Sequence, residues 1–133
     1  MKATIAYNEI SDFVERKYKV RPLFEAVDGR SVEVSYKPNR ILPAIKVKLH
    51  VEGVRRDIVC LSYDCGMAVS YIIAGVLTYL KEALPDAIEV NTDEKRVNIY
   101  LQRFKEFEKV WKIVALSDIK FDDDAASVVL ELL

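Results

Sequence analysis

The sequence contains a single histidine, His50, and only two cysteines, Cys60 and Cys65. A Ser–His–Asp or Cys–His catalytic site would have to be built around that one imidazole, and two thiols are too few for a disulfide-stabilised scaffold. The sequence also lacks a Walker A loop, a GxGxxG segment and an HExxH pair. These absences leave enzyme activity without support, so we predict a protein that is not an enzyme and has no cofactor.

Neither sign of charge is in excess, because 20 Lys and Arg residues stand against 21 Asp and Glu residues, for a formal net charge of -1. A nucleic-acid-binding protein usually carries a basic excess or a basic stripe. We therefore expect no nucleic-acid partner. Residues 1–13 lack the apolar core of a secretory signal peptide. The sequence as it stands thus predicts a cytoplasmic protein with reduced thiols.

Long hydrophobic runs are also scarce. Residues 65–80 carry no charged side chain, but a helix of this length would span only about 24 Å, and a bilayer-spanning helix needs about 20 apolar residues. Ser70 and Thr78 dilute the stretch further. We therefore predict no transmembrane segment and, instead, a buried core helix over 67–84 that Pro85 ends.

What the sequence does contain is alternation of apolar and polar residues, the pattern of a strand with one face in water. The alternation is clearest over 45–52, where Ile45, Val47, Leu49 and Val51 occupy every second position. Short connections between such segments favour an antiparallel meander. Strands are also predicted over 23–27, 31–36, 57–63, 88–90, 97–101, 119–121 and 128–132, and Gly53 is predicted to open the turn between 45–52 and 57–63.

Two further helices complete the predicted architecture. Ile10, Phe13, Val14 and Tyr18 stand at helical spacing and predict a first helix near the N-terminus. An amphipathic third helix is predicted over about 105–116. Together with the core helix and the strands, these elements predict a single α+β domain that spans the chain.

The pairing of neighbouring strands brings the histidine and one thiol together. Val51 paired with Val59 keeps both apolar sets on one face and places His50 beside Cys60, with Cys65 a few residues further on. Two thiolates and an imidazole are zinc ligands, and a Cys–His pair can form a nucleophile. The C-x4-C spacing, however, lacks a fourth ligand and matches no standard motif. We favour a solvated histidine beside reduced thiols and keep the metal site as a weak candidate.

The predicted core helix offers apolar side chains around most of its circumference. Where an antiparallel sheet wraps such a helix imperfectly, a groove remains that suits an acyl chain. Close packing without a groove is the alternative, and it is the commoner arrangement in protein interiors. The predicted ligand-lining residues are Met67, Tyr71, Ile72, Val76, Leu80, Phe107 and Trp111.

Residues 97–132 combine an alternating strand, a short helical segment with Val110 and Trp111, an acidic turn at 122–124 and a final strand. This order resembles the closing segment of bacterial one-module relatives of the tubular lipid-binding superfamily, whose best-known members are similar to bactericidal permeability-increasing protein. The resemblance implies a curved antiparallel sheet wrapped around the central helix 67–84, with an apolar interior that can hold lipid. It carries over no catalytic residue.

Three hypotheses follow for the function. The leading one is a non-enzymatic domain that binds a hydrophobic ligand, a lipid above all, between the curved sheet and the core helix. The alternative is an interaction or structural module with a closed core and no ligand, able to form homodimers through exposed strand edges. The second alternative is an enzyme or metal site at His50, Cys60 and Cys65.

Overall fold

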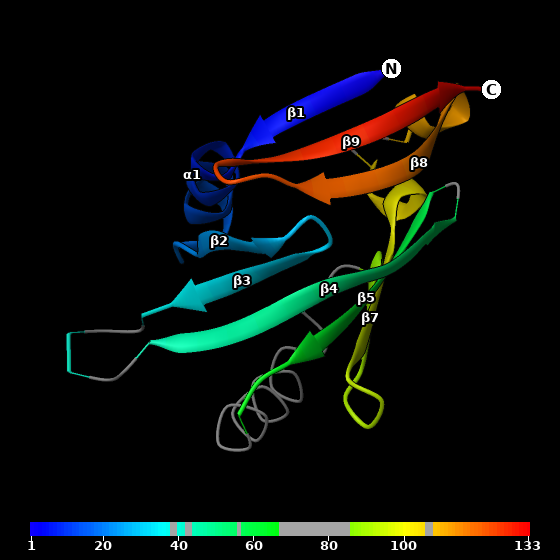
Figure 1. Ribbon diagram of the computed structural model, residues 1–133. Helices are drawn as coiled ribbons and strands as arrows, with labels where there is room; N and C mark the ends of the chain where they lie inside the picture. Colours follow the sequence, from blue (N-terminus) through cyan, green and yellow to red (C-terminus); the bar gives the residue numbers. More distant parts are fainter. Residues whose placement is uncertain (38–39, 42–43, 56, 67–85, 106–107) are drawn as a thin grey trace.

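The computed structural model describes residues 1–37, 40–41, 44–55, 57–66, 86–105 and 108–133. In these residues the strands form two antiparallel sheets, and one α-helix lies beside them (Figure 1). The predicted α+β class with antiparallel sheets is therefore confirmed. The elements are β1 (Lys2–Ala6), α1 (Tyr7–Tyr18), β2 (Leu23–Asp28), β3 (Ser31–Tyr36), β4 (Ile45–Arg55), β5 (Ile58–Asp64), β6 (Ile88–Asn91), β7 (Arg96–Tyr100), the 3-10 turns η1 (Leu101–Arg103) and η3 (Val110–Lys112), β8 (Val114–Phe121) and β9 (Ala125–Leu132).

The larger sheet has six strands in the order β2-β3-β4-β5-β7-β6. Residues directly opposite each other in neighbouring strands point to the same face of a sheet. Leu49 lies opposite both Val32 and Tyr63, which places apolar side chains of three strands together. The same alternation continues through β7. We call the resulting surface the apolar sheet face; it comprises Val32, Val34, Val47, Leu49, Val51, Val59, Leu61, Tyr63, Val97 and Ile99.

Gly53 does not open a turn, contrary to the sequence-based prediction. β4 continues to Arg55, and the pairing with β5 shifts between Val51 and Gly53, as in a β-bulge. The predicted pairing of Val51 with Val59 is therefore wrong, since Val51 lies opposite Leu61. The shift is by two residues, which is why the apolar side chains still share one face.

The smaller sheet has three strands in the order β1-β9-β8. Sequence alternation predicted the hairpin between β8 and β9 but missed β1, a short strand in which four of five residues are exposed. Main-chain pairing with β9 over Lys2–Ala6, and not the burial of side chains, holds β1 in place. Both ends of the chain consequently lie at the same end of this sheet (Figure 1).

The helix predictions have mixed outcomes. α1 is confirmed, but its buried positions are Tyr7 and Ser11, whereas the side chains of Phe13 and Tyr18 are about half exposed at 48% and 49%. The predicted helix over 67–84 lies outside the described residues. Within the described part of the chain, no helix is long and apolar enough to cross a membrane.

The amphipathic helix predicted over 105–116 is wrong. The described residues of this segment form the 3-10 turn η3 and then enter β8 at Val114. β-branched residues crowd here (Val110, Ile113 and Val114), and they favour strand over helix. Val114 pairs with Leu132 at the far end of the chain, so a long-range contact overrides the local periodicity.

The two sheets meet where β8 packs against β4. Val51 on β4 and Leu116 on β8 are among the most buried apolar side chains described, at 2% and 4% exposure. The backbone N–H of Phe121 donates to the carbonyl oxygen of Gly29 at 2.9 Å and joins the end of β8 to the β2–β3 turn. The hydrophobic core therefore lies between the sheets, beside the centre of β4.

Candidate functional site

The predicted ligand-lining set is represented in the described structure by Trp111. The other six residues of the set, Met67, Tyr71, Ile72, Val76, Leu80 and Phe107, lie outside the described residues. Trp111 belongs to η3, which packs against β8. The site is therefore built here from Trp111 and from the apolar sheet face.

Trp111 is the residue of η3 that turns toward the protein. Its neighbours Val110 and Lys112 are exposed, as is Ile113, whereas Trp111 is half-buried. Its indole nitrogen Nε1 is buried, with less than 1 Å² of accessible surface, and no described residue accepts a hydrogen bond from it. No other side-chain nitrogen or oxygen in the described part of the chain is buried in this way without a partner. Trp111 thus places an unused donor inside the structure.

The apolar sheet face is only partly covered. Val32, Val51 and Val59 are buried, but Val47 and Leu49 are half-buried, as are the other members of the face except Tyr63. On the opposite face of β4, Lys46, Lys48, His50 and Glu52 are exposed in succession. The sheet is therefore amphipathic, and an apolar ligand could be bound only on the first face.

His50 lies on this exposed face of the large sheet, opposite the apolar sheet face, which we call the wet face. Its Nδ1 is 2.6 Å from the hydroxyl oxygen of Ser31, a buried residue. In the sheet, His50 lies opposite Ser62, whereas Cys60 lies opposite Gly53. The expectation that His50 and Cys60 are cross-strand neighbours is therefore wrong, because β4 continues to Arg55 before the chain turns into β5 at Ile58.

The two thiols, Cys60 and Cys65, are half-buried and form no disulfide. Among the described residues, no group of three His, Cys, Asp or Glu side chains could hold a metal ion. The hydrogen-bond partner of His50 is thus a serine hydroxyl, which sequence reasoning missed. Alternation along each strand does not reveal which residues of β3 and β4 are neighbours, and only the register of the two strands brings Ser31 and His50 together.

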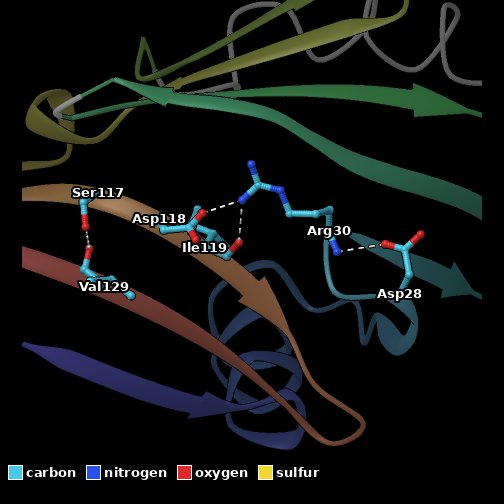
Figure 2. Close-up of polar contacts among 6 residues, drawn as sticks. All are labelled: Asp28, Arg30, Ser117, Asp118, Ile119 and Val129. Carbon is cyan, nitrogen blue, oxygen red and sulfur yellow. Dashed lines mark hydrogen bonds and ion pairs between the residues drawn. The ribbon is translucent and has the colours of Figure 1, made fainter.

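A second polar group joins the two sheets (Figure 2). The Arg30 guanidinium forms an ion pair with the carboxylate of Asp118 on β8 and also donates to the carbonyl oxygen of Ile119 at 3.4 Å. The backbone N–H of Arg30 donates to Asp28 at 2.8 Å and lowers the pKa of that carboxyl group. Burial alone would raise the pKa of Asp118, but the hydrogen bonds from Arg30 and from the backbone N–H of Ile119, together with the nearby positive charges, outweigh burial and lower this pKa. These contacts are partly exposed and serve to hold the sheets together.

A hollow of about 480 Å³ adjoins η1 and is lined by Asp86, Gln102, Arg103, Lys105 and Glu108. Its lining carries charges of both signs, which does not suit an apolar ligand. The Arg103 guanidinium lies over the ring of Tyr100 at 4.1 Å and donates to the carbonyl oxygen of Asp86 at 3.2 Å. One guanidinium nitrogen and the cationic face of Arg103 are therefore already engaged within the protein.

Comparisons with protein families, curated proteins and solved structures found no match to this chain. The function is therefore inferred from the arrangement of its own residues. Two features bear on it: an apolar sheet face that is incompletely covered, and the buried indole donor of Trp111.

Proposed function

We propose that this protein is a non-enzymatic domain that binds a hydrophobic ligand, a lipid above all, between the apolar sheet face and the segment 67–84. The observation that carries the proposal is the incomplete burial of the apolar sheet face, whose members on four strands are mostly half-buried. A contiguous apolar surface of this kind marks a site for a ligand or another protein surface.

The composition of the segment 65–80 supports the same proposal. A stretch without charged side chains is stable only where most of it leaves water. We propose that 67–84 forms a central helix over the apolar sheet face, with the sheet curved around it. A lipid chain would then lie between two apolar surfaces, without any polar group of the wet face nearby.

The resemblance of residues 97–132 to one-module relatives of the tubular lipid-binding superfamily is part of this proposal. It is supported by the β8–β9 hairpin with its acidic turn and by the alternating strand β7. It is weakened by η3, which stands where the resemblance implied a short helix.

Two neighbouring positions on β4 provide a matched test. Val47 lies on the apolar sheet face and is half-buried, whereas Lys46 lies on the wet face and is exposed. Purified protein should release lipid on organic-solvent extraction and bind the apolar dye N-phenyl-1-naphthylamine. Val47→Ser should weaken dye binding severalfold, and Lys46→Ser should leave it unchanged. Ligand-free protein that binds no dye would refute the proposal, as would equal effects of the two variants in proteins of equal melting temperature.

The competing candidate is an interaction module that pairs with a second copy through β1. This strand bonds to β9 on one side, and four of its five residues are exposed. Exposed edges of this kind invite pairing with another strand. Thr4→Pro would remove a backbone donor at the centre of β1. Sedimentation that shows a dimer for the natural sequence and a monomer for Thr4→Pro would favour this candidate, whereas a monomer in both cases would exclude it.

A further inference from the structure

We propose that the indole N–H of Trp111 donates a hydrogen bond to an acceptor oxygen of the bound ligand, which is therefore an apolar chain with a carbonyl, ester or carboxylate group. The inference rests on the proposed function and specifies the chemistry of its ligand. A hydrocarbon has no acceptor atom and would leave the indole N–H without a hydrogen bond.

The geometry singles out this side chain. Nε1 of Trp111 is out of reach of solvent and has no acceptor among the described residues. Buried donors in folded proteins are nearly always hydrogen-bonded, because leaving one without a partner is costly. The described part of the chain satisfies its other buried side-chain donors, including the hydroxyl of Ser11, which bonds to the carbonyl of Pro22 at 2.6 Å. Trp111 is the exception in this part of the chain, and we place its acceptor on the ligand.

The position of η3 keeps this donor fixed. The backbone N–H of Ile113 donates to the carbonyl of Val110 at 3.1 Å, and the N–H of Leu133 donates to the carbonyl of Ile113 at 2.9 Å. The next residue, Val114, is buried at the start of β8. A donor held by its backbone in this way loses little freedom on binding, so the hydrogen bond to a ligand keeps most of its strength.

The chemistry of an indole N–H restricts what it can recognise. It donates one hydrogen bond, accepts none and carries no charge at any accessible pH. It can therefore bind a carbonyl, ester or carboxylate oxygen, but it gives a hydrocarbon chain no polar contact. An aromatic body with one polar edge also suits the point where the apolar tail of a lipid meets its oxygen-bearing end.

Trp111→Phe tests the inference, because it keeps an aromatic ring and removes the N–H. The dye N-phenyl-1-naphthylamine has no acceptor oxygen and serves as the matched control, and laurate and methyl laurate are the competing ligands. We expect the variant to bind the dye as the natural protein does. Displacement by both laurate and methyl laurate should weaken about 10-fold, the effect of one lost hydrogen bond. A loss confined to laurate would support the hydrogen bond and narrow the acceptor to a carboxylate.

Trp111 is the only tryptophan in the chain, which gives a second measurement on the unaltered protein. Its emission should shift when laurate or methyl laurate displaces the dye. Unchanged displacement in Trp111→Phe together with unchanged tryptophan emission would overturn the inference and leave the proposed function intact. Failure of both the dye and laurate to bind the natural protein would instead overturn the proposed function.

Discussion

Tyr7 connects three parts of the fold, and its removal tests how the two sheets are held together. Its hydroxyl donates to the backbone carbonyl of Asp122 in the β8–β9 turn at 2.6 Å, and its ring stacks on Phe24 of β2 with centroids 5.8 Å apart. Its own backbone N–H donates to the carbonyl of Asp124 at 3.0 Å. Tyr7→Phe keeps the ring stack and removes only the hydroxyl contact.

The expected loss follows from these contacts. A hydrogen bond within a protein contributes about 1 kcal/mol net, and Asp122 is exposed, so water can replace part of what its carbonyl loses. We therefore expect Tyr7→Phe to lower the free energy of unfolding by about 1 kcal/mol. Tyr7→Ala also removes a buried ring and should cost about 3–5 kcal/mol.

Tyr7 also makes the stability depend on alkaline pH. Burial raises the pKa of its phenol, and the carboxylates of Asp122, Asp123 and Asp124 raise it further. The unfolded chain then loses its phenolic proton at a lower pH than the folded protein does. The stability due to Tyr7 is therefore complete below the unfolded pKa of about 10 and is lost as the pH rises from there through the folded pKa.

Urea denaturation at pH 7 and at several values above pH 9 measures both effects. Tyr36→Phe is the matched control, because the hydroxyl of Tyr36 has no hydrogen bond in the described structure and should be nearly neutral. Above pH 10, Tyr7→Phe should lose stability less steeply than the natural protein. Equal losses for the two phenylalanine variants, or an alkaline slope unchanged by Tyr7→Phe, would contradict the assigned role.

Three further predictions concern stability and use the same denaturation assay. Val51→Ala should cost about 2–3 kcal/mol, because it removes two methyl groups from a buried position in β4; a loss below about 1 kcal/mol would place the core elsewhere. Arg30→Met should cost no more than about 1 kcal/mol, and less at high salt, because the ion pair with Asp118 is partly exposed; a larger loss insensitive to salt would contradict this. Ser31→Ala should cost about 1 kcal/mol and Ser35→Ala less, since Ser31 is buried and bonded to a histidine; equal losses would show that this bond contributes nothing.

Alternation of apolar and polar residues predicted most of the strands. Each strand has one face toward the core and one toward water, and this difference leaves an alternating pattern in the strand's own sequence. The apolar residues of 45–52 point inward, and all of its polar residues are exposed, as expected. β1 escaped detection because most of its residues are exposed and its pairing partner lies about 120 residues away. Main-chain pairing of this kind leaves no periodic signal in the sequence.

The candidate site could be predicted only in part, for a related reason. Composition pointed to Trp111, but its orphan N–H depends on how η3 meets β8, a long-range contact. The expected neighbours His50 and Cys60 are not paired, because β4 continues through a bulge at Gly53 to Arg55, whereas the sequence predicted a turn at Gly53. A glycine in a strand fits either feature, and only the pairing of the two strands decides between them.

The wet face of the large sheet explains why ligand binding belongs on the other face. Across three strands, Glu33 lies opposite Lys48, and Lys48 lies opposite Asp64. Opposite charges placed directly across strands stabilise a sheet, and charged groups of this kind are costly to remove from water. A lipid or the apolar surface of another protein that bound to this face would have to remove water from all of these charged side chains. The apolar sheet face carries no such cost, and the hydrophobic ligand is therefore expected there.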